Sequence, residues 1–299
     1  MMENAGFGGF CVDLHMHSRA SDGALEPAQL MEAAAEKGKR LVALTDHDTC
    51  AGVPEAERRA GELGLAFIPG IELGCGGEKE IHILGYGVNP ADAGLMRFRE
   101  DRQRDRTERA ERMMDLLAGA GMPLDREEIY AQVSGVIGRP HLAAGMVRKG
   151  YVHSLQEAFD RFLSRGCSCY VPSPYVSVQE VCRVILNAGG VPVLAHPMEL
   201  QAGEAVLSSL IHEWSCYGLA GMEVYHPSTA NHKVAMLLGL ARREGLFVTG
   251  GSDYHGTSTK TDGIGQGTDR WESAAEDLPR LFAAMGRPFP KAKLFRMDR

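Results

Sequence analysis

Residues 13–23 read DLHMHSRASDG, and the fold can be worked out from the pattern that this stretch begins. Apolar and polar side chains alternate from Val12 to His17, with the period of two that is typical of a β-strand. His15 and His17 should therefore leave the same face of one strand, and Asp22 follows five positions later. Two such histidines fit a metal site, but they also fit a strand whose polar face happens to be rich in histidine. The rest of the chain must decide between the two.

The composition is that of an ordinary globular protein. The chain has 299 residues, of which 44% are hydrophobic and 24% charged, enough for one large α/β domain or two ordinary ones. The formal net charge of −7 argues against a broad basic surface for long duplex nucleic acid, although it allows a local phosphate site. We therefore expect any nucleic-acid substrate to be short.

The ends of the chain and its cysteines bear on the cellular compartment. The opening MMENAGFGGF has no basic segment followed by an apolar core, and no window approaches 18 apolar residues. The seven cysteines form no CxxC pair, so they are most simply free thiols, and a cysteine-rich zinc site is disfavoured. The sequence thus predicts a cytoplasmic protein without a membrane span. It does not indicate an oligomeric state.

Short apolar runs bounded by Gly, Pro or Asp recur along the chain. Segments with helical spacing, such as 27–38 and 53–63, separate most of them. This is the βαβ rhythm of a mostly parallel sheet or barrel. The runs are FCVDLHMH, RLVALTDHD, LAFIPGIEL, EIHILGYGV, GVPVLAHP, AGMEVYH and LFVTGGSDYH.

The rhythm changes over residues 91–187, which we interpret as a helical insertion in a barrel formed by residues 1–90 and 188–299. Within it, residues 97–112 carry seven arginines and five acidic residues, mixed at helical spacings. Such a run fits a solvated helix or a patch that binds nucleic acid, and the solvated helix is favoured.

Potential metal ligands stand at the ends of six runs. In an α/β barrel the C-terminal strand ends form the active-site face, so these residues should converge. Chance placement of 11 histidines would rarely bring one to so many strand ends. The motifs are DLHMHS (13–18), LTDHD (44–48), GIE (70–72), HILG (82–85), AHP (195–197) and SDYH (252–255).

As a set and in this order, these motifs resemble those of the polymerase and histidinol phosphatase (PHP) superfamily of metal-dependent phosphoesterases. The resemblance spans nearly the whole chain outside the insertion. It implies an α/β fold, a distorted (β/α)7 barrel, which agrees with the seven apolar runs. It also implies a site with two or three divalent metal ions, of which Mn, Fe and Zn suit imidazole and carboxylate ligands.

The family's ligand positions carry over onto this chain in three sets. Five of these residues, His15, His17, Glu72, Asp253 and His255, are also the predicted catalytic residues. By the resemblance, the first metal is held by His15, His17, Glu72 and Asp253; the second by Glu72, as a bridge, with His82 and His196; and the third by Asp22, His47 and His255.

Other polar residues near the motifs receive lesser roles. We expect Asp13, Asp46 and Asp48 to orient imidazoles rather than to bind metal. His226 lies on the same rim but matches no ligand of the family. The remaining histidines fit ordinary surface or core positions: His153, His212 and His232.

Substrate contacts are expected from the insertion, in IGRPHLA (137–143). Arg139 could grip a phosphate through two nitrogens and His141 could donate a further hydrogen bond, so the insertion would act as a lid. The alternative is a capping turn with an exposed arginine. Arg19 and His226 are further candidates for substrate binding.

Two or three adjacent divalent ions suit phosphoryl chemistry, and no protein nucleophile is then required. Consistently, the sequence has no GxSxG elbow, P-loop or dinucleotide fingerprint. The layout resembles stand-alone phosphoesterases that remove the 3'-phosphate of nucleoside 3',5'-bisphosphates, some of which trim short oligonucleotides from the 5' end. A phosphatase of the histidinol phosphate type and a metal-binding module without turnover are the alternatives.

Overall fold

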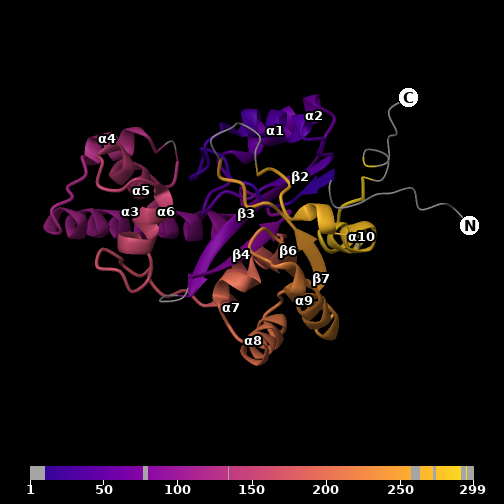
Figure 1. The fold of residues 1–299 in the computed structure, drawn as a ribbon. Coiled ribbons are helices and arrows are strands. Elements are labelled where there is room, and N and C mark those ends of the chain that lie inside the picture. The colour runs from indigo at the N-terminus through magenta and orange to yellow at the C-terminus, as the bar shows by residue number, and fades with distance from the viewer. Residues whose placement is uncertain are drawn as a thin grey trace, which may run out of the picture.

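The computed structural model describes residues 11–76, 80–133, 135–256, 263–271, 274–290 and 294 (Figure 1). The opening MMENAGFGGF lies outside these residues. Among the described helices, none is both long enough and apolar enough to cross a bilayer.

One seven-stranded sheet forms the centre of the molecule, with the strands in sequence order. Its first and last strands approach each other, because Leu14 N donates to Gly250 O at 3.2 Å and His17 N donates to Tyr254 O at 2.9 Å. The sheet is therefore a nearly closed barrel, which confirms the predicted seven-stranded fold. The strands are β1 (Val12–Asp13), β2 (Leu41–Leu44), β3 (Ala66–Gly76), β4 (Glu80–Tyr86), β5 (Val191–Leu194), β6 (Gly221–Tyr225) and β7 (Phe247–Gly250).

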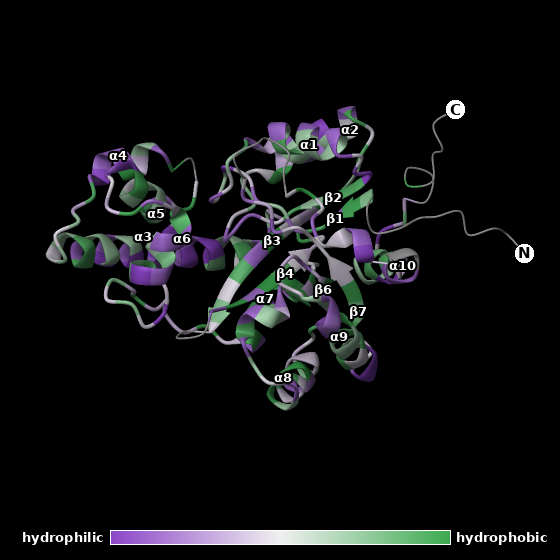
Figure 2. Ribbon diagram, viewed as in Figure 1, coloured by the Kyte–Doolittle hydropathy of each residue, from purple (hydrophilic) through white to green (hydrophobic). Residues whose placement is uncertain are grey.

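The barrel departs from a regular βαβ series at β4, which runs antiparallel to both β3 and β5. The other neighbouring pairs are parallel. Figure 2 shows that apolar residues dominate the strands, as expected where helices cover the outer face of a sheet. The covering helices are α1 (Pro27–Glu36), α2 (Val53–Glu62), α7 (Val178–Asn187), α8 (Glu204–Cys216), α9 (Asn231–Arg243) and α10 (Ala274–Ala284).

The helices form where local signals favour them. Pro27 stands in the first turn of α1, where its missing N–H costs nothing, and the Ser177 hydroxyl caps α7 by accepting from Glu180 N at 3.1 Å. The helical spacings at 27–38 and 53–63 correspond to α1 and α2 within two residues. Two short 3-10 turns, η3 (Pro197–Leu200) and η4 (Thr268–Arg270), follow β5 and β7.

A second body of helices projects from one side of the barrel (Figure 1). It has its own hydrophobic cluster, which runs from Ala110 to Val171 and includes Met113 and Leu142. Its elements are α3 (Ala93–Gly119), α4 (Arg126–Ala131), α5 (Arg139–Arg148), α6 (Leu155–Ala158) and the π-helical turn η2 (Phe159–Leu163).

The proposed insertion, residues 91–187, does not coincide with one hydrophobic cluster. Its helix α7 and the first turns of α3, at Leu95 and Phe98, pack in the barrel cluster. The cause is that α7 covers the antiparallel strand β4 and its neighbour β5. Helical spacing alone does not tell which core a helix joins.

The charged helix α3 is only partly solvated, contrary to the favoured interpretation. Arg109 is buried and donates to Val171 O at 2.7 Å, to Ser173 Oγ at 2.8 Å and to Glu80 Oε1 at 2.6 Å. One turn earlier, Arg106 forms an ion pair with Asp48. Because these residues are three apart, they lie on one face of the helix, and this face is turned toward the barrel.

The two hydrophobic clusters should open independently of each other. Leu142 is fully buried in the insertion cluster, so Leu142→Ala should lower the free energy of opening of the insertion by about 2 to 5 kcal/mol. Hydrogen exchange of the α5 amides should accelerate accordingly, while exchange in α1 and α2 stays unchanged. The control is Leu155→Ala, because Leu155 is 48% exposed. Equal acceleration in both bodies would show that they form one cooperative unit.

Candidate metal centre

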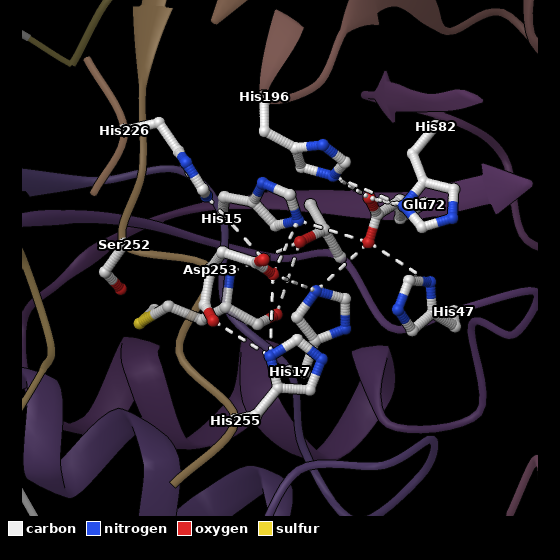
Figure 3. A network of polar contacts seen from close by, with 12 residues as sticks. His15, His17, His47, Glu72, His82, His196, His226, Ser252, Asp253 and His255 are labelled. Atoms are coloured by element: carbon white, nitrogen blue, oxygen red, sulfur yellow. Dashed lines mark hydrogen bonds and ion pairs between the residues drawn. The ribbon is translucent and has the colours of Figure 1, made fainter. Parts of the chain in front are cut away.

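The polar residues predicted at the strand ends meet at one mouth of the barrel, around the carboxylate of Glu72 on β3 (Figure 3). Glu72 is fully buried. Asp253, which follows β7, lies 3.3 Å from His15 Nε2 and 3.1 Å from His17 Nε2. The two oxygens of Glu72 lie within 3.2 Å of a ring nitrogen of five histidines: His15, His17, His47, His82 and His196.

Three groups of donor atoms can be distinguished in this cluster. In each group, one nitrogen or oxygen per residue lies within 4.8 Å of the others. His196 adjoins the third group, since its Nε2 lies 3.1 Å from Glu72 Oε1 and 3.3 Å from His82 Nδ1. The groups are His15, His17, Glu72 and Asp253; His17, Asp22, His47 and His255; and His47, Glu72 and His82.

The structure thus brings together every residue for which the resemblance implies a metal. It differs from the expected sets in that His17 and His47 each lie between two groups. His47 Nδ1 faces Glu72 at 3.1 Å while its Nε2 lies 4.0 Å from Asp22. In His17 the two nitrogens are exchanged, since Nε2 faces Glu72 at 3.1 Å and Nδ1 lies 4.0 Å from Asp22.

The donor atoms suit divalent cations. Among the described residues, both ring nitrogens of His17, Nδ1 of His47, and Oδ1 of Asp22 and of Asp253 are buried without a hydrogen bond, which is costly unless a bound group satisfies them. Two ligands about 2.1 Å from one ion lie roughly 3.0 to 3.4 Å apart. The contacts of Glu72 with the imidazoles span 2.9 to 3.2 Å, close to this range.

The electrostatics of the cluster favour ionised carboxylates. Burial raises the pKa of Glu72, but His47, His15 and His82 outweigh it and hold that pKa well below its usual range. Conversely, burial lowers the pKa of His255, but Asp22 and Asp253 raise it to about 10. The mouth of the barrel therefore presents negative charge to any cation that replaces the protons on the imidazoles.

Backbone strain is concentrated at the same strand ends. Asp48, His196 and Asp253 have φ of 51°, 25° and 51°, in the left-handed region that side chains other than glycine disfavour. Each residue follows a different strand. Such conformations cost about 1 to 3 kcal/mol each and persist where the surrounding structure enforces them, which is common at functional sites.

The carboxylates expected to orient imidazoles have other partners. Asp13 accepts from the Ser252 hydroxyl at 2.6 Å and from Gly265 N at 2.6 Å, and Asp46 accepts from the Ser18 hydroxyl at 2.7 Å. Asp48 pairs with Arg106. These residues fix the loops that carry the histidines rather than the rings themselves.

A buried carboxylate that does orient an imidazole is Glu223 on β6, which the motif analysis missed. It accepts from Nδ1 of His15 at 3.1 Å. A single Glu in the otherwise uncharged, fully buried strand GMEVY is the signal that could have identified it. The motif analysis also missed the contact of Arg106 with Asp48, because nothing in the sequence distinguishes Arg106 from the other arginines of residues 97–112.

A cleft of about 750 Å³ joins the cluster to the insertion. His82 and His196 line its barrel side, and Arg139, Arg165 and Tyr170 line the opposite side. Arg139 is not the exposed turn residue of the alternative interpretation: its side chain is 26% exposed, and Nη2 donates to Glu80 Oε2 at 2.5 Å.

The other predicted substrate contacts are placed differently. His141 accepts from Gly138 N at 3.0 Å and so caps its own helix through Nδ1. Arg19 forms an ion pair with Glu26 at 3.4 Å and is not among the residues lining the large cleft. His226 lines a second cleft of about 360 Å³, and its Nε2 lies 3.6 Å from Asp253 Oδ2.

Cysteine is a poor candidate for a nucleophile here. Burial raises the pKa of Cys50 to about 11 and that of Cys182 to about 12, so both thiols stay protonated near neutral pH.

Comparison with known proteins agrees with this geometry. The sequence profile of the PHP domain matches residues 13–111. The chain is 33% identical over 276 residues to a 3',5'-nucleoside bisphosphate phosphatase of Chromobacterium violaceum, with 90% of this chain and 93% of the relative covered. It is also 33% identical over 244 residues to a 5'-3' exoribonuclease of Haemophilus influenzae, covering 81% and 89% of the two chains.

Among solved structures, a protein of Bifidobacterium adolescentis assigned as a metal-dependent phosphoesterase superposes with a TM-score of 0.81 at 30% identity, covering 91% of this chain and 96% of that one. These relatives match most of the length of the chain, and the solved structure shares its fold. The chain belongs to the PHP family of metal-dependent phosphoesterases.

Proposed function

We propose that the protein hydrolyses the 3'-phosphate of nucleoside 3',5'-bisphosphates, with two or three divalent ions, Mn, Fe or Zn, held at the barrel mouth. The observation that carries this proposal is the large cleft, which has imidazoles of the cluster on one side and two guanidinium groups on the other. The proposed ligands are His15, His17, Asp22, His47, Glu72, His82, His196, Asp253 and His255.

The cleft fits a substrate with two anionic groups. Its volume of about 750 Å³ lies within the range of small-molecule sites. Arg139 stands over the rings of Phe159 and Tyr170, at 5.7 and 5.9 Å, and Glu80 holds its Nη2. A guanidinium fixed in this way can bind a distal phosphate with little loss of conformational entropy.

The proposed function gives the residues of the cluster and of the cleft different roles. Glu72 holds the two halves of the cluster together, Asp253 and Asp22 flank it, and Arg139 binds the phosphate that is not cleaved. When bound, the divalent ions supply the positive charge and Lewis acidity that phosphoryl transfer requires. The bisphosphate phosphatase of Chromobacterium violaceum supports this choice of substrate.

A second candidate function is the trimming of short oligonucleotides from the 5' end. The second cleft, which His226 and Ser228 line, supports it, because Glu199 lines this cleft as well as the large one. A nucleotide chain could thus continue past the cluster. The similarity to a 5'-3' exoribonuclease points in the same direction.

A panel that measures the release of inorganic phosphate and of mononucleotides tests the proposal. It compares adenosine 3',5'-bisphosphate, a 5'-phosphorylated RNA trinucleotide, a long single strand, a duplex and histidinol phosphate, with protein stripped by EDTA and reloaded with Mn, Fe or Zn. We expect the highest kcat/KM for the bisphosphate, with adenosine 5'-phosphate as the product and no reaction on duplex, because the net charge is −7. A preference for histidinol phosphate, or turnover without metal, would refute the proposal.

The bridging role of Glu72 makes a quantitative prediction. Because its carboxylate contacts histidines of two donor groups, Glu72→Gln should lower the metal content by more than one equivalent per chain. Asp22→Asn is the matched control, since Asp22 belongs to one group and should affect only one equivalent. Elemental analysis after metal loading measures both. A metal content in Glu72→Gln equal to that of the wild type would contradict the bridging role of Glu72.

The role of Arg139 can be read from substrate selectivity. Arg139→Ala should weaken transition-state binding of the bisphosphate by about 1.5 to 3 kcal/mol, the range for a hydrogen bond to a charged group, and that of adenosine 3'-phosphate by less. Arg161→Ala is the control, because Arg161 pairs with Glu157 on the exposed side of the insertion. Equal losses on both substrates would place Arg139 at the reacting phosphate instead.

A further inference from the structure

Glu223 is the only charged residue of β6, and its side chain is completely buried. A carboxylate in this position needs donors to offset its lost hydration. It has two, from different segments of the chain. Nδ1 of His15 donates to Oε1 at 3.1 Å, and the backbone N–H of His196 donates to Oε2 at 2.9 Å.

The two donors belong to different parts of the metal centre: His15 to the group with His17, Glu72 and Asp253, and His196 to the residues beside Glu72 and His82. The second ring nitrogen of His15, Nε2, faces Asp253 at 3.3 Å in the first donor group. His196 Nε2 faces Glu72 Oε1 at 3.1 Å, beside His82. Glu223 touches none of the facing atoms, so it lies behind the cluster and holds one residue of each part.

The bond to His15 determines which ring nitrogen can bind a metal. A carboxylate that accepts from Nδ1 keeps the proton there, so the lone pair of Nε2 points into the cluster. The bond to His196 acts on the backbone, where φ is 25°. A hydrogen bond at this N–H helps to hold a conformation that the chain would otherwise relax.

Close packing behind the cluster prevents rearrangement. A Cβ placed on Gly251 would lie 2.2 Å from Cβ of His15 and 2.9 Å from Oε1 of Glu223. Only glycine therefore allows β7 to end so close to this pair. The contact between His15 and Glu223 is therefore enclosed.

We propose that Glu223 is a positioning residue that fixes His15 and His196 together and thereby couples the two metal sites that share Glu72. The site around Asp22 and His255 does not depend on it. This inference rests on the proposed metal-dependent function, and it assigns a role to a residue that binds no metal itself.

The test compares Mn binding by wild type and by Glu223→Gln, with ion stoichiometry and affinity measured on metal-stripped protein. A glutamine has nearly the same size but carries no charge, and its amide nitrogen takes the place of one of the two oxygens that face His15 Nδ1 and His196 N, so it holds the two donors less firmly than the carboxylate does. Affinity for two ions should fall about 10- to 100-fold, the usual effect of losing an outer carboxylate, while one site keeps its affinity. Thermal unfolding of the metal-free protein serves as the check on folding.

Asp277→Asn is the control, because Asp277 is a buried carboxylate on α10 that accepts from Val248 N and from Trp271 Nε1 rather than from a residue of the cluster. It should lower thermal stability without changing the relative affinities of the sites. Unchanged Mn binding by Glu223→Gln, or equal weakening of every site, would overturn the inference. Wild-type protein that binds no ion would instead refute the proposed function.

A second measurement needs no variant. In the Zn-loaded wild-type protein with ¹⁵N-labelled histidine, the long-range ¹H–¹⁵N spectrum should show His15 protonated at Nδ1. A proton at Nε2 of His15 would contradict the role of Glu223 even if the variant failed to fold.

Discussion

The buried carboxylate of Glu72, surrounded by five imidazoles, is the constraint around which the barrel mouth is organised. An isolated charge at this depth would be too costly to keep, so it must be matched by cations. Protons on the histidines can provide that charge, and so can divalent ions. The five histidines lie on or directly after four different strands, so the closure of the sheet and the assembly of the site are one event.

In the proposed function, chemistry and selectivity are carried by different parts of the chain. The barrel supplies the donor groups, whereas the insertion, with its own hydrophobic cluster, supplies Arg139 and Tyr170 to the cleft. The two parts are tied by Arg106 and Arg109 of α3, which pair with Asp48 and Glu80 of the barrel. This separation explains how relatives with one barrel can differ in substrate.

The strands and the convergence of their polar ends could be predicted because period-two runs that end in His, Asp or Glu leave few other arrangements, whereas the proposed ligand sets came from the resemblance to the PHP superfamily. His15, Glu72 and Asp253 were found in this way. Glu223 stands out as the one charged residue of GMEVY, but nothing in that stretch tells which atoms face it. Likewise, charge spacing predicted α3, but the burial of Arg109 depends on its contacts with the barrel, which the sequence of the helix alone does not show. Nor could the place of α7 be predicted, because α7 covers β4 and β5, and β4 runs antiparallel to both of its neighbours.

Anomalous diffraction from crystals of the Mn-loaded protein would test the central claim most directly. The account predicts Mn peaks on both sides of the Glu72 carboxylate, one within bonding distance of His15 and Asp253 and another near His82 and His196, with a third beside Asp22 and His255 when the site is full. Crystals with Mn bound elsewhere, or with Glu72 bonded only to protonated histidines at saturating Mn, would contradict it.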